Sequence, residues 1–233
     1  MAEQQSIVIV GGTAGIGRHL AEKFANRGDE VVITGRDSAR AQAIAEEIGG
    51  NTRGLGFDLA EPTEIAGRLA DVGKVDGLVL TAIERDMNGV RELDVPLAVR
   101  ATTIKLVGYI EVVHALAPRL TPNASIVLFG GQARERPYPG STTTTITNGG
   151  VSSMVRTLAL ELAPIRVNAI HPGVVGDSPA WAGNEAFLEM GKSKTLNKRL
   201  TTMDDCVSAT MFLMENQAVI GVNLVIDAGW SLL

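Results

Sequence analysis

Three glycines near the N-terminus lie where a predicted strand turns into a predicted helix. Gly11, Gly15 and Gly17 fall between the apolar run SIVIV and the helical pattern RHLAEKFANRG. The first glycine permits a tight turn, the second lets a pyrophosphate approach the backbone, and the third lets the helix pack against the strand. The helix N-terminus then offers free N–H groups to the phosphates. Because a strand precedes and a helix follows, we interpret this loop as a dinucleotide site and not as a merely structural turn.

The end of the second predicted strand indicates which dinucleotide is preferred. A site for NAD usually places an acid there to bind the ribose 2′-hydroxyl, but VVITGRD has Gly35 followed by Arg36. A guanidinium suits a 2′-phosphate. Asp37 lies beyond the acid position, and we interpret it as the cap of a helix that begins at residue 38. We therefore expect NADP(H) to be preferred over NAD(H), although Arg36 could also be a solvated surface side chain.

These motifs resemble the short-chain dehydrogenase/reductase family over about residues 6–230. The glycine loop, FDL (57–59), HPGVV (171–175) and GVNLVIDAG (221–229) are each similar to a family segment. The resemblance implies hydride transfer between a nicotinamide dinucleotide and an unknown small alcohol or carbonyl substrate. It also implies the cofactor-binding residues Gly11, Thr13, Ala14, Ile16, Arg36, Asp58, Leu59, Thr81, Ala82, Pro172, Gly173 and Val175.

The same resemblance places other residue types at the family's catalytic positions. The family uses a Tyr acid, a Lys one helical turn later, a Ser that binds the carbonyl, and an Asn on the preceding long helix. Those positions hold, in the same order, Thr144, Asn148, Gly131 and Lys105. An aliphatic hydroxyl has a pKa far above the roughly 10 of a phenol, so Thr144 is a poor proton donor. Asn148 can hydrogen-bond a ribose but carries no charge to stabilise an alkoxide.

Lys105 is the substitute that could still do chemistry. If desolvation lowers its pKa, it could donate a proton or bind the cofactor ribose. Alternatively, its flexible stem carries the ammonium to solvent. Tyr138 in RERPYPG could supply a phenol or pack in a turn. We expect Tyr109 in the core or in an interface, and we do not expect His171 to be catalytic.

Three functions are compatible with this pattern. The first is an atypical NADP(H)-dependent oxidoreductase whose hydride transfer is slow or non-standard because the tetrad is replaced. The second is a catalytically inactive NADPH-binding protein that acts as a sensor or an assembly partner. The third is a lyase or isomerase that uses the same cleft without redox chemistry.

The elements that must position these residues alternate between strands and helices. Runs that read as strands cover 6–12, 30–35, 53–59, 75–82, 124–131, 166–173 and 222–229, and most of them are continuously apolar, which is typical of buried parallel strands. Amphipathic segments predict helices over 15–27, 38–49, 62–72, 97–117, 147–162 and 204–215. The alternation predicts one α/β domain over 1–233, with a Rossmann-type doubly wound parallel sheet of about seven strands in an αβα arrangement. The resemblance makes 178–200 the mobile substrate loop.

Composition excludes several other classes of protein. A net charge of −5 and a pI near 5.3 argue against a nucleic-acid surface. A single cysteine, Cys206, excludes an internal disulfide, and three scattered histidines have no metal-ligand spacing, so we expect no metal. The acidic N-terminus is neither a signal peptide nor a membrane span, and we expect a cytoplasmic protein. Extra apolar surface on 97–117 and 147–162, together with the resemblance, predicts a homodimer or homotetramer.

Overall fold

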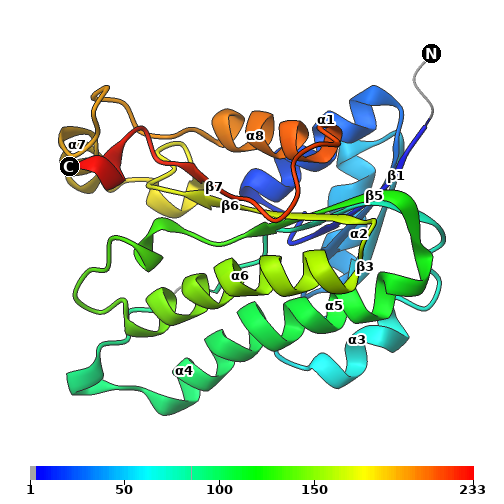
Figure 1. Ribbon diagram of the computed structural model, residues 1–233, viewed down its shortest axis with the longest axis horizontal. Coiled ribbons are helices and arrows are strands. Elements are labelled where there is room, and N and C mark those ends of the chain that lie inside the picture. The colour runs from blue at the N-terminus through cyan, green and yellow to red at the C-terminus, as the bar shows by residue number, and fades with distance from the viewer. Residues whose placement is uncertain (1–3, 85) are drawn as a thin grey trace.

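The computed structural model describes residues 4–84 and 86–233. Over these residues the chain forms a single α/β domain, in which a seven-stranded sheet lies between two layers of helices (Figure 1). No helix in the described part of the chain is long and apolar enough to span a bilayer.

All the sheet pairings are parallel, and the strand order is β3-β2-β1-β4-β5-β6-β7. The strands are β1 (Ser6–Val10), β2 (Glu30–Gly35), β3 (Asn51–Gly56), β4 (Val75–Leu80), β5 (Leu120–Phe129), β6 (Arg166–Pro172) and β7 (Asn223–Ile226). The order reverses at β1, which pairs with β2 on one side and β4 on the other. Ligands of such open sheets bind beyond the carboxyl ends of the strands at this reversal. The predicted doubly wound Rossmann-type sheet is confirmed.

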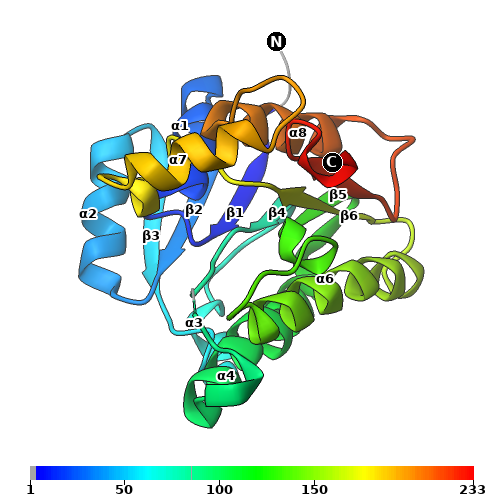
Figure 2. The same ribbon diagram turned by 90° about the vertical axis from the view of Figure 1, so that its left-hand side faces the viewer.

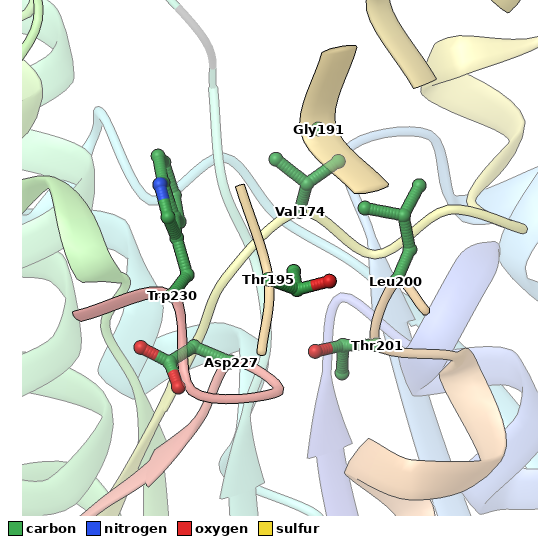
Figure 3. Close-up of a pocket in the computed structure, with 7 residues that line it drawn as sticks. All are labelled: Val174, Gly191, Thr195, Leu200, Thr201, Asp227 and Trp230. Carbon is green, nitrogen blue, oxygen red and sulfur yellow. The ribbon is translucent and has the colours of Figure 1, made fainter. Parts of the chain in front are cut away.

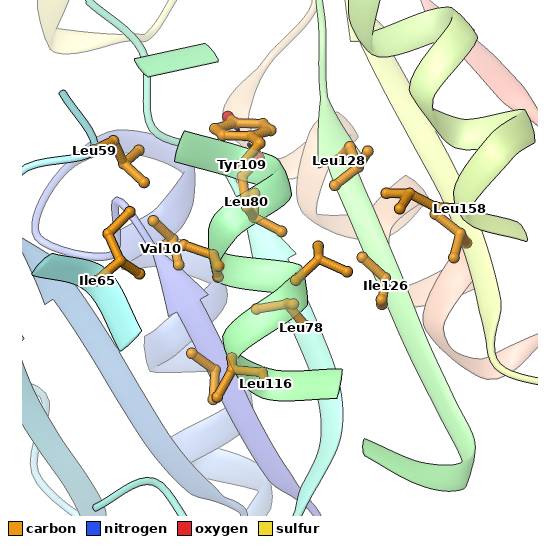
Figure 4. Packing of buried hydrophobic residues seen from close by; sticks show 14 of the residues in the cluster. Val10, Leu59, Ile65, Leu78, Leu80, Tyr109, Leu116, Ile126, Leu128 and Leu158 are labelled. Atoms are coloured by element: carbon orange, nitrogen blue, oxygen red, sulfur yellow. Dashed lines mark hydrogen bonds between the residues drawn. The ribbon is translucent and has the colours of Figure 1, made fainter. Parts of the chain in front are cut away.

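Helices cover both faces of the sheet and bury two apolar clusters (Figures 1 and 2). One face is covered by α1 (Gly15–Arg27), α2 (Ser38–Ile48) and α8 (Met203–Glu215). The other face is covered by α3 (Pro62–Arg68), α4 (Val95–Thr102), α5 (Tyr109–Leu116) and α6 (Thr142–Glu161). Figure 4 shows this second cluster, where strand residues such as Leu78 and Ile126 meet Tyr109 and Leu116 of α5. Because both faces are buried there, the central strands β1, β2, β4 and β5 contain apolar runs without strict alternation.

Helix α6 begins at Thr142, so the predicted start at residue 147 is wrong. A run of threonines is a weak helix former, and hydroxyl hydrogen bonds compensate for this. Thr145 Oγ1 donates to the backbone oxygen of Ala133 at 3.1 Å, and Thr147 Oγ1 donates to that of Thr144 at 3.2 Å. Contact with the segment after β5 therefore extends the helix beyond what local propensity predicts.

The long helix predicted over 97–117 is interrupted. Helices α4 and α5 are joined by a π-helical segment, Thr103–Gly108, which contains Lys105. Such π turns are rare and often lie at functional sites. A Cβ on Gly108 would lie 2.6 Å from the backbone oxygen of Leu59, so glycine lets this segment lie directly against a residue predicted to contact the cofactor. The interruption reflects this tertiary contact, which the apolar periodicity does not encode.

The predicted substrate loop, 178–200, contains a helix that the sequence pattern did not predict. Helix α7 (Glu185–Ser193) is capped by Asn184, whose Oδ1 accepts a hydrogen bond from Phe187 N at 3.3 Å. The rings of Trp181 and Phe187 stack with their centroids 4.4 Å apart. Figures 1 and 2 place α7 on the same side of the sheet as α8.

Candidate cofactor and active site

A cavity of about 620 Å³ opens at the carboxyl ends of β1, β2 and β4, where the strand order reverses. Its lining includes most of the residues predicted to bind a dinucleotide: Gly11, Thr13, Ala14, Ile16, Arg36, Asp58, Leu59, Thr81, Ala82 and Val175. The volume lies in the range of cofactor and ligand pockets. Pro172 and Gly173 do not line it. They lie at the end of β6, where an added Cβ on Gly173 would be 3.0 Å from Asp227 Cβ.

The glycine loop is packed so tightly that a side chain does not fit at Gly11 or Gly17. A Cβ on Gly17 would lie 2.2 Å from the backbone oxygen of Gly11, and Gly11 itself has a φ of +87°. Thr81 Oγ1 fixes the turn from β4 by donating to the backbone oxygens of Val10 at 3.0 Å and Gly11 at 3.2 Å. No side chain caps α1 at Ala14, so the first N–H groups of the helix remain available to an anion. The residues present therefore fit a pyrophosphate.

Four charged side chains form a cluster at one end of this cavity. Arg36, Asp58 and Glu84 line the cavity there, and Arg100 binds two of them. Arg100 Nε and Nη2 bind the two carboxylate oxygens of Glu84 at 2.8 and 3.0 Å, and Nη2 also binds Asp58 Oδ2 at 3.0 Å. Glu84 Oε2 in turn lies 3.5 Å from Arg36 Nη1. Burial alone would raise the pKa of Asp58, but hydrogen bonds from Ala60 N and Arg100 hold it below its usual value. Glu84 and Arg100 were missed by the sequence analysis because they act through partners distant in sequence.

The Asp37 side chain accepts a hydrogen bond from Arg40 N at 2.7 Å and caps α2, as predicted. The same helix start brings Arg40 to the cavity lining beside Arg36. Arg40 thus supplies a second cation beside Arg36, from the helix that follows β2. Its position one turn into a helix that begins next to Arg36 was the signal available in the sequence.

Lys105 is buried, and its side chain does not reach solvent. Only 4% of the residue is exposed. Its ammonium donates to Tyr109 Oη at 3.0 Å and lies 3.4 Å from the backbone oxygen of Ala82, a residue that lines the cavity. Tyr109 Oη donates to that same oxygen at 2.7 Å. Burial lowers the pKa of Lys105 to about 7 and raises that of Tyr109.

Gly131 and Asn148 face one another. A Cβ on Gly131 would lie 2.9 Å from Asn148 Nδ2, so the amide takes space next to the position where a serine would stand. Gly131 N donates to His171 Nδ1 at 3.2 Å, and His171 Nε2 is 2.8 Å from Asn223 Oδ1. Burial lowers the pKa of His171 to about 4, although the Asn223 bond opposes this. The ring is therefore a neutral, fully bonded structural group at pH 7.

Thr144 is turned toward a buried carboxylate. Its Oγ1 donates to Asp86 Oδ1 at 3.0 Å, and Asp86 is 6% exposed. Within the described part of the chain, Asp86 Oδ2 has no hydrogen-bond partner. Asp86 follows β4 in a loop that the sequence analysis passed over, because no motif marks it. None of Thr144, Asn148, Gly131 and Lys105, the residues predicted to occupy the family's catalytic positions, lines the cavity.

Comparison with known proteins identifies the family. A family model described as enoyl-(acyl carrier protein) reductase matches residues 11–231. A solved short-chain dehydrogenase/reductase from Brucella melitensis superposes with a TM-score of 0.91 and 26% identity, over 98% of this chain and 97% of that one. The chain belongs to the short-chain dehydrogenase/reductase family.

Relatives within the short-chain dehydrogenase/reductase family are named as enzymes. A 3-oxoacyl-[acyl-carrier-protein] reductase from Bos taurus is 30% identical over 232 residues, covering 96% of this chain and 97% of the relative. A (21S)-21-acetoxyl-apo-melianone synthase from Melia azedarach is 28% identical over 246 residues, covering 99% and 91%. These family members span the whole described domain, so the likeness is not confined to the glycine loop.

The hydrogen bond between Thr144 and Asp86 gives a stability prediction at the position where the sequence resemblance predicts the family's tyrosine. Thr144→Val removes the hydroxyl and leaves Asp86 Oδ1 buried without its donor, so we expect the free energy of unfolding to fall by about 1–3 kcal/mol. Urea unfolding at pH 7 measures this change. The control is Thr142→Val in the same helical turn, whose hydroxyl has no partner among the described residues and which should change stability by less than about 0.5 kcal/mol. Equal effects of the two substitutions would contradict the prediction.

Residues of the predicted substrate loop, 178–200, and of the segments that follow β6 and β7 line a second, very small cavity of about 10 Å³ (Figure 3). Thr195, Thr201 and Asp227 line it beside Trp230. Thr201 Oγ1 donates to the backbone oxygen of Ile226 at 3.1 Å, and Asp227 accepts from Gln132 Nε2 at 2.9 Å. This space holds at most one water. The loop is therefore packed onto β6 and β7 here, and the space for a larger ligand is the 620 Å³ cavity.

Proposed function

We propose that the chain is an NADP(H)-dependent oxidoreductase that acts on a carbonyl or alcohol, with slow hydride transfer because the tetrad is replaced. The observation that carries the proposal is the large cavity at the reversal of strand order, lined by the tight glycine loop. The loop would hold the pyrophosphate, and Asp58 with Leu59 would contact the adenine. The bound dinucleotide would supply or accept the hydride.

The preference for NADP(H) over NAD(H) rests on two guanidiniums. Arg36 and Arg40 both line the cavity where the second strand ends. Arg36 has 73% of its side chain exposed, so it is free to turn toward a phosphate. Two adjacent cations favour a dianionic 2′-phosphate over a neutral hydroxyl. The ion pair between Arg36 and Glu84 opposes this preference.

Proton transfer is the part of the reaction that the chain itself must supply. A carbonyl that accepts a hydride needs one proton to become an alcohol, and a group with a pKa near the working pH transfers protons best. Lys105, with a pKa lowered to about 7 by burial, meets that requirement. Its contact with the backbone of Ala82 places the ammonium directly behind the cavity wall. Thr144 and Asn148 would act only as hydrogen-bonding groups.

A second candidate, a dinucleotide-binding sensor without catalysis, is favoured by one specific observation. No occupant of the four tetrad positions lines the cavity, while the residues that cradle the cofactor do. Lys105 is bonded to Tyr109 in the core, so its proton has no open path to a ligand in this conformation. A protein that only senses the cofactor needs the residues that bind the dinucleotide and does not need a proton donor.

Binding and turnover of NADPH separate the two candidates. We expect enhanced NADPH fluorescence on mixing, and slow oxidation of NADPH with a carbonyl panel that includes a 3-oxoacyl thioester, the substrate class in the relatives' names. Turnover should be lost in Lys105→Met and retained in Thr144→Ala. Binding without turnover on the whole panel would favour the sensor, and absence of binding by either dinucleotide would overturn both.

Self-association is proposed from the apolar residues that remain exposed on the helices flanking the site. They are Val95, Val99, Val107 and Ile110 on the α4–α5 segment and Ile146 and Leu160 on α6. Exposed apolar patches of this kind mark interaction surfaces. We propose a homodimer or homotetramer, which light scattering would measure. The cytoplasmic location and the absence of nucleic-acid and membrane partners stay predictions from the sequence.

A further inference from the structure

Glu84 is held in a fixed position at the adenosine end of the cavity. Its two carboxylate oxygens bind Arg100 in a bidentate arrangement, at 2.8 and 3.0 Å. Such paired bonds fix orientation as well as charge. Arg100 is itself anchored to Asp58 at 3.0 Å. Only 26% of the Glu84 side chain is exposed, so the carboxylate is a built part of the cavity lining.

The carboxylate of Glu84 reaches the guanidinium of Arg36, which directly follows β2. Glu84 Oε2 lies 3.5 Å from Arg36 Nη1. Arg36 lies at the end of β2 and Glu84 beyond the end of β4, and these strands flank β1 in the sheet. The ion pair therefore extends across the strand that leads into the glycine loop, at the mouth of the cavity.

This geometry sets a competition for Arg36. A 2′-phosphate that binds Arg36 must draw the guanidinium away from Glu84 or accept a carboxylate as its neighbour, and both carry a cost in free energy. A ribose 2′-hydroxyl bears no charge and meets no such repulsion. The charge of Glu84 therefore weakens the binding of NADP(H) and has almost no effect on the binding of NAD(H).

We propose that Glu84 is a specificity-determining residue that competes with a cofactor 2′-phosphate for Arg36 and so narrows the preference for NADP(H) over NAD(H). This inference rests on the proposed function, because it needs a dinucleotide in the cavity. It adds that the selectivity of the site is set by a residue after β4 as well as by the arginine after β2. Arg100 holds Glu84 in place and is itself anchored by Asp58, whose charge also acts on Arg36 through space but without a direct ion pair.

The test measures dissociation constants of NADPH and NADH by fluorescence titration, without any turnover. Glu84→Gln keeps the shape and removes the charge. We expect NADPH to bind about three- to tenfold more tightly, the amount that loss of one partly exposed ion pair and one repulsion is worth. NADH should change less than twofold. In an Arg36→Ala background the same substitution should give no more than a twofold gain, because the competition has been removed.

A charge-matched control is available in Glu215→Gln. Glu215 forms a similar ion pair with Arg27 Nη1 at 3.0 Å but does not line the cavity. It should leave both dissociation constants unchanged. Glu84→Ala, checked by thermal unfolding, guards against an effect peculiar to glutamine and should give the same NADPH-specific gain.

The outcomes distinguish this inference from the proposed function. Weaker binding of both dinucleotides in Glu84→Gln would make Glu84 a support for Arg100 and overturn the inference alone. Unchanged binding of both, or an equal gain with Glu215→Gln, would also overturn it while the proposed function stands. Failure of the unsubstituted chain to bind either dinucleotide would overturn the proposed function first and this inference with it.

Discussion

Replacing Gly17 with alanine is expected to abolish the binding of NADPH and NADH. The added Cβ would lie 2.2 Å from the backbone oxygen of Gly11 and 2.7 Å from Thr81 Oγ1. Backbone cannot yield as a flexible side chain does, so the turn between β1 and α1 must move away from β4. That movement removes the cradle for the pyrophosphate. We expect affinity to fall by more than about 100-fold, a loss of about 3 kcal/mol.

Isothermal titration with each dinucleotide measures this loss, and unfolding in urea shows whether the chain still folds. Overpacking of this kind costs about 1–3 kcal/mol of stability. The matched control is Gly67→Ala, an exposed glycine within α3 whose added Cβ meets nothing within 4 Å. Since alanine is the better helix former, this control should keep binding and gain slightly in stability. Binding retained by Gly17→Ala would refute the interpretation of the glycine loop.

The second large effect is a pH-dependent stability contributed by Lys105. Its pKa is lowered from 10.5 to about 7 in the folded chain, because burial penalises the charged ammonium. Below about pH 7 the folded and unfolded chains both carry the proton, and the folded state bears the full cost of the buried charge. Between about pH 7 and 10.5 the unfolded chain holds a proton that the folded chain has released. The free energy of unfolding therefore rises with pH across this window.

Lys105→Met isolates this contribution. A shift of this size corresponds to several kcal/mol, and we expect the difference in unfolding free energy between the unsubstituted chain and Lys105→Met to change by about 3 kcal/mol from pH 7 to pH 10. At pH 7 and below, methionine should be the more stable, because it replaces a buried charge by an apolar chain. The measurement is urea unfolding at a series of pH values.

Lys23→Met is the control for the lysine experiment. Lys23 is exposed on α1, so its replacement should give a difference that is flat over the same pH range. A flat difference for Lys105→Met as well would show that the ammonium is solvated in solution. In that case the alternative stated in the sequence analysis would be correct, namely that the flexible side chain of Lys105 carries its ammonium to solvent.

The residues proposed to bind the cofactor could be predicted from the sequence because the pattern that marks them is local. Gly11, Gly15 and Gly17 are adjacent along the chain, and the strand before them and the helix after them are visible in the apolar pattern. The topology of parallel sheets then brings the ends of β1, β2 and β4 to one edge. Asp37 as a helix cap was predictable for the same reason, since a cap depends on its next few residues.

Only the tertiary structure decided what the remaining residues do, because their partners are remote in sequence. Thr144 on α6 meets Asp86 after β4, and Arg36 after β2 meets Glu84 after β4. The burial of Lys105 depends on the π-helical segment, which turns its side chain toward Tyr109 and away from solvent. The run of threonines at the start of α6 is helical because the backbone oxygen of Ala133 accepts a hydrogen bond from the hydroxyl of Thr145. Local periodicity predicts most of the strands and helices, whereas the partner of a buried polar group is set by three-dimensional packing alone.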